Sequence, residues 1–179
     1  MRTTCLSILG AFGLLISPLA QADVVNATPD GFELKLTRSS NIEALDQYER
    51  IFDIADWWSS AHTWSGDAAS LSLTSRDVGG QWRESWANGD VEHGRIIASG
   101  FLGGKFMVRF DAPLGPLQGM GVQSVLTMEV QEVSEIEGTS EVTFTYFVTG
   151  ADFQALNQIA PVVDGVLSEQ IDRLVSVRE

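Results

Sequence analysis

The sequence contains almost no cysteine and very little histidine. Its single cysteine, Cys5, lies near the N-terminus, so the rest of the chain can form neither a disulfide nor a cysteine-ligated zinc site. Its two histidines, His62 and His93, lie far apart and lack the H-x-x-x-H spacing of a zinc-binding helix. We therefore predict no metal and no cofactor, and we expect burial of apolar side chains to hold the domain together.

Basic residues are also scarce. The chain has 11 Lys and Arg residues against 24 Asp and Glu residues, which gives a formal net charge of −13. This charge repels nucleic-acid backbones and anionic lipid surfaces, so neither is predicted as a partner. The glycine-rich loops that bind phosphates or dinucleotides are missing, as is the G-x-S-x-G turn that presents a nucleophilic serine. Nothing in the sequence indicates the oligomeric state.

Residues 1–22 have the pattern of a secretory signal peptide. Arg2 supplies a positive start, residues 6–19 are mostly apolar, and Ala20-Gln21-Ala22 matches the A-x-A site that a signal peptidase cleaves. A membrane anchor is the alternative, but the apolar run is shorter than the roughly 20 residues of a spanning helix. We expect an exported mature domain, periplasmic or secreted, that comprises residues 23–179, lacks Cys5 and keeps no integral membrane span.

The mature chain predicts one α+β domain. Alternating apolar and polar residues indicate a strand over about 24–38, and a stripe at helical spacing indicates a helix over about 41–58. Short alternating runs separated by glycine-containing turns predict six antiparallel strands over 69–149. From Phe153 onward apolar residues again recur every three or four positions, and Pro161 predicts a kink or a break near Ala160 in this long helix.

This order resembles the helix-grip fold of the START and birch-pollen-allergen-like superfamily (SRPBCC), which includes polyketide cyclases and lipid-transfer proteins. The resemblance is carried by Asp56-Trp57-Trp58 at the end of the first helix, by the Gly-Gly-x-Trp-x-Glu hairpin at 79–84 and by the C-terminal helix. It implies a curved seven-stranded antiparallel sheet wrapped around the long helix. It also implies a cavity between sheet and helix for a small apolar or amphipathic ligand, such as a lipid.

The residues expected to line this cavity are aromatic, apolar or ionisable side chains on the inner face of the sheet, in the 113–121 loop and at the start of the helix. All five tryptophans fall within residues 57–86, and this excess argues for a pocket, while the alternative is an ordinary core, which aromatic residues at strand and helix spacing more often form. The predicted ligand-binding residues are Trp82, Glu84, Trp86, His93, Arg95, Met107 (or its neighbour Phe106), Met120, Phe144, Tyr146, Phe153 and Leu156.

Glu84 is the first candidate for chemistry, because strand alternation places it between Trp82 and Trp86, where apolar rings would raise its pKa. A hairpin turn at Asn88-Gly89 would set Glu84 opposite Arg95. Two interpretations stay open: a structural Glu84–Arg95 ion pair, or a cyclase- or dehydratase-like enzyme that uses Glu84 and a histidine, His93 or His62, for proton transfer.

The loop over residues 113–121 combines glycine and proline with the apolar residues Leu114, Leu117 and Met120. Apolar residues in a connecting segment suggest a lid over the pocket mouth. A packed connection is the equally weighted alternative.

Overall fold

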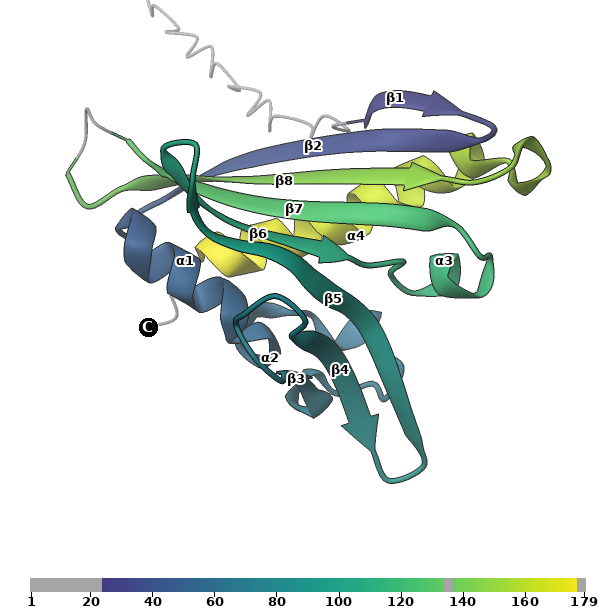
Figure 1. Ribbon diagram of the computed structural model, residues 1–179, viewed down its shortest axis with the longest axis horizontal. Helices are drawn as coiled ribbons and strands as arrows, with labels where there is room; N and C mark the ends of the chain where they lie inside the picture. Colours follow the sequence, from purple (N-terminus) through teal and green to yellow (C-terminus); the bar gives the residue numbers. More distant parts are fainter. Residues whose placement is uncertain (1–23, 134–136, 177–179) are drawn as a thin grey trace, which may run out of the picture.

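A computed structural model describes residues 24–133 and 137–176, so the predicted signal peptide lies outside the described residues. Eight strands of these residues form one antiparallel open sheet in the order β1-β2-β8-β7-β6-β5-β4-β3 (Figure 1). The strands are β1 (Val24–Thr28), β2 (Gly31–Ser40), β3 (Leu71–Leu73), β4 (Gln81–Trp86), β5 (Gly89–Leu102), β6 (Lys105–Asp111), β7 (Gln123–Glu132) and β8 (Ser140–Thr149).

The predicted seven strands become eight because the segment 24–38 folds back on itself. A turn at Pro29 and Asp30 separates β1 from β2, and Thr28 then pairs with Gly31 across the hairpin. The Thr28 hydroxyl donates a 2.6 Å hydrogen bond to the Asp30 carboxylate inside this turn. The six consecutive strands predicted over 69–149 are confirmed as β3 to β8.

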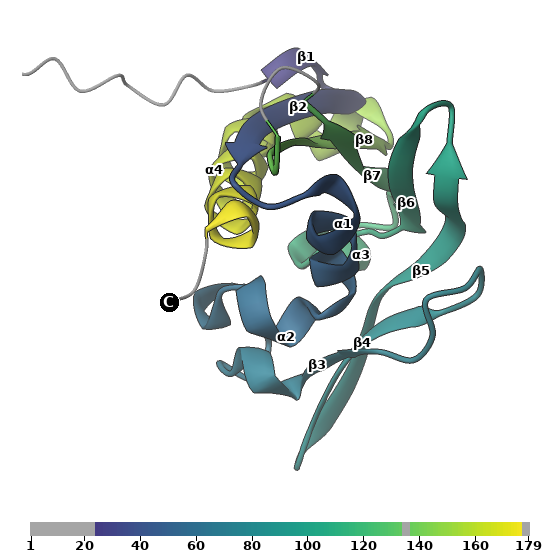
Figure 2. The same ribbon diagram turned by 90° about the vertical axis from the view of Figure 1, so that its left-hand side faces the viewer.

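The helices lie in the hollow of the curved sheet (Figure 2). They are α1 (Ala44–Phe52), α2 (Ile54–Trp57), α3 (Pro116–Gly119) and α4 (Leu156–Val175), with short 3-10 turns η1 (Ser60–His62), η2 (Ala68–Ser70) and η3 (Asp152–Gln154). The expected helix over 41–58 is split at Asp53. In the C-terminal helical segment, the break predicted near Ala160 lies instead at Ala155, whose backbone adopts the left-handed conformation with φ 50°. Pro161 lies inside α4. None of the described helices is long and apolar enough to cross a membrane.

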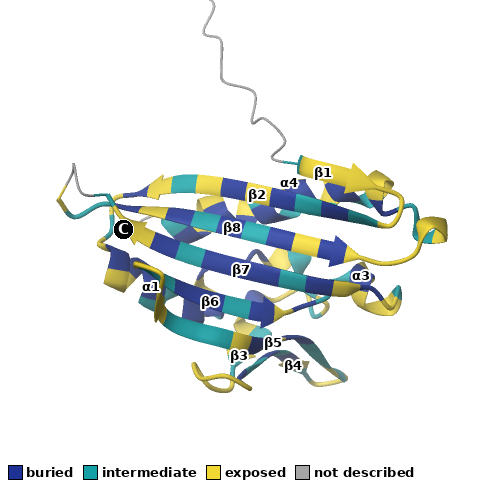
Figure 3. Ribbon diagram, turned by 45° about the horizontal axis from the view of Figure 1, so that its top comes forward, coloured by how far each residue is buried: buried dark blue, intermediate teal, exposed yellow. Residues whose placement is uncertain are grey.

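Burial alternates along the strands, as a sheet with one covered face requires (Figure 3). Leu34 and Leu36 of β2, Phe144 of β8 and Phe110 of β6 are fully buried against the helices. Leu167 and Ile171 of α4 fill the same core. The α+β architecture with a sheet around a long C-terminal helix is thus confirmed.

Gly94 of β5 marks the point where this strand comes closest to the start of the 112–122 connection. A Cβ atom at position 94 would lie 2.6 Å from the Cβ of Ala112 and 2.9 Å from the carbonyl oxygen of Asp111. We expect Gly94→Ala to lower the free energy of unfolding by about 1–3 kcal/mol through this overpacking, measured by urea denaturation.

Gly165→Ala is the matched control for that substitution. Gly165 is an exposed position of α4 with no atom near the added methyl group, so alanine should stabilise the helix by about 0.5–1 kcal/mol. Equal destabilisation by both substitutions would contradict the close approach at Gly94.

Candidate functional site

An apolar pocket of about 360 Å³ lies between α4 and the loops at one end of the sheet. Its volume is in the range of pockets that hold small organic molecules. Its walls come from the chain around η1, the loop that contains α3, the first half of α4, and His93 of β5. The lining residues are Trp58, Ala61, His62, Thr63, Trp64, His93, Leu114, Gly115, Pro116, Leu117, Met120, Ile159, Val162, Val163, Val166 and Leu167.

The α3 loop is a packed wall of this pocket. Tyr146 holds its start, because the phenol donates a 2.8 Å hydrogen bond to the Ala112 carbonyl and accepts one of 3.2 Å from the N–H of Leu114. Burial raises the pKa of Tyr146, so the phenol stays protonated as a donor. Gln118 adds a 2.6 Å bond to the carbonyl of Glu92, and Leu117 is buried. These contacts favour the packed connection over a free lid.

His93 is the buried polar group of the pocket wall. Its Nε2 lies 2.8 Å from Oε2 of Glu84, a side chain with no exposed surface. The predicted pairing of Glu84 with Arg95 is wrong, because Glu84 pairs with Val91 in the β4–β5 register and a register shift follows between Trp82 and Arg83. His93 is the residue of β5 left unpaired at this shift, and it lies two residues after Val91, the partner of Glu84, on the same face of the sheet.

Arg95 instead forms an exposed ion pair on its own strand. Its guanidinium donates to both carboxylate oxygens of Glu92, at 2.8 and 3.0 Å. The pair lies outside the pocket lining.

Glu84 of β4 also binds the segment after η1, which forms one wall of the pocket. Its carboxylate accepts hydrogen bonds from the backbone N–H groups of Trp64, at 3.1 Å, and of Ser65. Burial alone would raise the pKa of Glu84, but the hydrogen bonds from Ser65, Trp64 and His93 outweigh it, and the pKa lies below its ordinary value. The predicted raised pKa is therefore wrong, and Glu84 accepts three hydrogen bonds at the pocket wall.

The start of the same segment, around η1, is hydrogen-bonded to α4. The N–H of Ser59 donates a 2.8 Å bond to Oε1 of the buried Gln170, and Nε2 of His62 lies 2.9 Å from Glu169. A hydrogen bond from Ser59, opposed by burial and assisted by His62, lowers the pKa of Glu169. Both histidines of the chain thus line one pocket, and each has its Nε2 against a glutamate.

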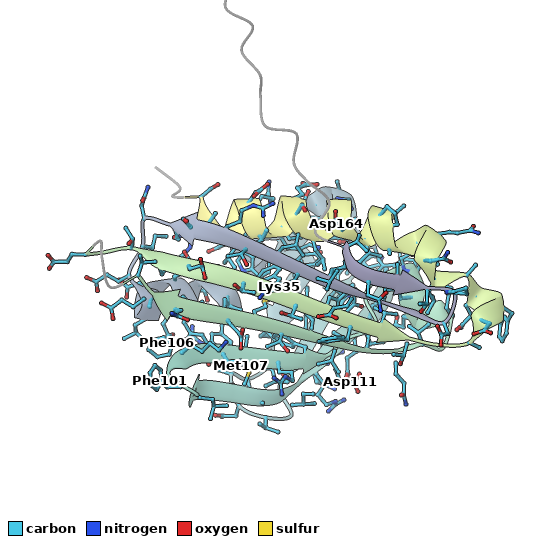
Figure 4. All side chains as sticks on the ribbon, turned by 90° about the horizontal axis from the view of Figure 1, so that it is seen from above. Lys35, Phe101, Phe106, Met107, Asp111 and Asp164 are labelled. Carbon is cyan, nitrogen blue, oxygen red and sulfur yellow. The ribbon has the colours of Figure 1, made fainter. Side chains whose placement is uncertain are left out.

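Of the predicted site residues, His93, Met120 and His62 line the pocket. Trp82 lies one layer deeper, 4.8 Å from Trp58 between ring centroids, and Glu84 lies behind His93. The other predicted residues lie outside the pocket lining. Phe144, Tyr146 and Leu156 belong to the core, and Met107 is buried on the convex face of the sheet beside Phe106 (Figure 4). Trp86 covers Gly89, Arg95 is exposed, and Phe153 is 88% exposed.

Sequence reasoning missed Trp58, Trp64 and the α4 residues Ile159, Val163 and Val166 as pocket residues. Helical spacing marks the three aliphatic residues as one face of α4. Only packing shows that this part of the face is left uncovered by the sheet.

In sequence, no protein-family model and no curated protein matches this chain. Solved structures share its fold. Norcoclaurine synthase from Thalictrum flavum, a point mutant in complex with a transition-state analogue, is 13% identical with a TM-score of 0.57 and covers 87% of this chain and 95% of its own. The same enzyme in complex with dopamine and hydroxybenzaldehyde is 14% identical, with a TM-score of 0.52 over 96% of this chain and 95% of its own.

A Bacillus thuringiensis protein is 16% identical, with a TM-score of 0.53, and covers 80% of this chain and 96% of its own. Identities this low establish a common fold and nothing finer. The neighbours share the fold predicted from the sequence, an antiparallel sheet around a long C-terminal helix.

Proposed function

We propose that this protein binds a small apolar or amphipathic molecule in the pocket between α4, η1 and the α3 loop. The observation that carries the proposal is a pocket of about 360 Å³ with almost wholly apolar lining and one buried histidine. Such a combination is typical of ligand sites, where apolar walls supply affinity and a few polar groups supply orientation. The norcoclaurine synthase structure that contains dopamine and hydroxybenzaldehyde supports small-molecule binding by this fold.

The proposal includes export. Its support is the charged, apolar and A-x-A order of residues 1–22, and the acidic composition of the remainder. Expression of the full chain in a bacterial host followed by N-terminal sequencing should find Asp23 as the first residue, in the periplasmic or secreted fraction. A cytoplasmic chain that keeps its N-terminus would refute export and leave the pocket argument untouched.

Ligand binding is tested with N-phenyl-1-naphthylamine, an uncharged dye whose emission rises in apolar surroundings. The wild-type protein should bind the dye at one site, and native mass spectrometry should detect small molecules that co-purify with the protein. Absence of both dye binding and a co-purified molecule would overturn the proposed function.

Val163→Trp is expected to weaken dye binding at least tenfold. Val163 lines the pocket from α4 and is only partly buried, so an indole there would occupy ligand space with little disturbance of the core. Gln158→Trp provides the control, because Gln158 is an exposed residue of α4 outside the lining. Dye titrations and thermal melts of both variants check the prediction, and equal dye affinity in both would place the dye elsewhere.

Proton-transfer catalysis is a second candidate function, and the Glu84–His93 pair favours it. A carboxylate on Nε2 orients an imidazole so that Nδ1 can take a proton from a bound molecule. A suitable assay follows exchange of the α-protons of 2-tetralone in D₂O by NMR. Exchange above background that His93→Phe abolishes would support an enzyme, while exchange at the background rate with wild-type protein would oppose it.

A further inference from the structure

The side-chain donors inside the pocket are already committed to protein acceptors. The Nε2 proton of His93 is directed at the Glu84 carboxylate. The indole N–H of Trp58 donates to the carbonyl of His62 at 2.9 Å, and the hydroxyl of Thr63 donates to the carbonyl of Ser60 at 2.9 Å. Trp64 is the exception, but its side chain lies at the exposed rim. A ligand in the interior therefore meets few side-chain donors.

An acceptor, in contrast, is free. Glu84 accepts hydrogen bonds from two backbone N–H groups, so Nε2 of His93 donates to it, and in this tautomer of the ring Nδ1 is a lone-pair acceptor. Within the part of the chain that the structure describes, no protein donor is found for this Nδ1. The buried polar atom that remains for a ligand is thus an acceptor.

Apart from its two histidines, the pocket has no ionisable side chain in its lining among the described residues. The carboxylates of Glu84 and Glu169 lie just behind these histidines, so an anionic group would meet negative charge there. A cationic group would lose its hydration among aliphatic side chains such as Val163 and Leu167 without a carboxylate of its own. Both kinds of charge are disfavoured.

We infer that the ligand is an uncharged, hydroxyl-bearing apolar molecule, an alcohol or a phenol, whose hydroxyl donates a hydrogen bond to Nδ1 of His93. This inference rests on the proposed function and names the chemical class of its ligand. A fatty-acid carboxylate and a molecule that offers only acceptors, such as a quinone, are excluded by the same accounting of donors and acceptors.

Three naphthalene probes of similar size test the inference by isothermal titration calorimetry at neutral pH. 2-Naphthol offers a donor, 2-methoxynaphthalene offers an acceptor only, and 2-naphthoate is an anion. We expect 2-naphthol to bind about five- to tenfold tighter than 2-methoxynaphthalene, the ratio expected for one neutral hydrogen bond, and 2-naphthoate to bind weakest. In His93→Phe, with folding checked by a thermal melt, the preference for 2-naphthol should disappear.

The outcomes separate this inference from the proposed function. If none of the three probes binds although N-phenyl-1-naphthylamine does, the hydroxyl-donor inference is overturned and the proposed function stands; if the dye and co-purified molecules are absent as well, the ligand-binding function itself fails. If all three bind equally, or 2-naphthoate binds tightest, the pocket function stands and the hydroxyl-donor inference is overturned. Because the wild-type comparison needs no variant, it decides the question even if His93→Phe does not fold. A folded His93→Phe that keeps the full preference would refute the assignment of the acceptor to His93.

Discussion

Glu84→Ala should lower the free energy of unfolding by about 3–5 kcal/mol, because each hydrogen-bond donor that loses its acceptor in a buried site costs about 1–3 kcal/mol. The substitution leaves three donors without their acceptor: the partly buried N–H groups of Trp64 and Ser65, and the buried Nε2 of His93. Because these contacts also hold the wall of the pocket, we expect dye binding to fall with stability. Urea denaturation at neutral pH measures the loss.

Arg95→Ala is the control for this prediction. Arg95 is exposed and pairs with Glu92 on the same strand, so its loss should cost about 1 kcal/mol or less. If Arg95→Ala proved as damaging as Glu84→Ala, the sequence-based pairing of Glu84 with Arg95 would describe the protein better than the structure does.

The same carboxylate makes a defined contribution to the pH dependence of stability. The pKa of Glu84 is lower in the folded protein than the ordinary value of 4.5, so the unfolded chain takes up its proton first as the pH falls. The stabilisation by Glu84 is therefore complete above the ordinary pKa and is lost as the pH falls through the lowered one. Urea denaturation from pH 7 to pH 3 should show the difference between wild type and Glu84→Gln shrinking below about pH 4.5.

Trp82→Ala is the second substitution for which we expect a large effect, a loss of about 3–5 kcal/mol in the free energy of unfolding. The Trp82 ring is 1% exposed and packs edge-on against Trp58 and Phe110, with centroid distances of 4.8 and 5.8 Å. Removing it leaves a cavity directly behind Trp58, which lines the pocket. Chemical denaturation measures the loss, and dye titration shows whether the pocket changes with it.

Trp82→Phe separates packing from polarity at this position. The indole Nε1 of Trp82 is buried and has no hydrogen-bond partner among the described residues, so phenylalanine removes an unsatisfied donor while it keeps an aromatic ring. We expect a loss of less than about 2 kcal/mol. Equal losses for Ala and Phe would mean that Trp82 stabilises the fold through its indole N–H rather than through packing.

The predicted elements were most accurate where the pattern is local. Alternation in Phe32–Leu36 and helical spacing through α4 each identify a strand or helix because burial of one face imposes that period on neighbouring residues. The division of 24–38 into two strands is missed by the sequence analysis, which predicts one strand across the turn at Pro29 and Asp30.

The candidate site was less predictable. His93 and Met120 line the pocket, but the predicted partner of Glu84 is wrong because the turn lies at residues 87–88, where Trp86 pairs with Gly89, and not at Asn88-Gly89. Moving the turn changes every cross-strand partner in the hairpin, so Glu84 pairs with Val91 and not with Arg95. The aromatic residues Phe144 and Tyr146 face the helices as expected, yet they lie in core filled by α1 and α4.

The sequence by itself determined the α+β class, the consecutive antiparallel strands, the long C-terminal helix and the acidic surface, because each depends on composition or on a short repeat along the chain. Only the tertiary structure decided which part of α4 is left uncovered, and that both histidines meet there with a glutamate behind each. The physical reason is that His62 and Glu169, like Glu84 and His93, are joined by packing between separate elements, and such contacts leave no period in the sequence.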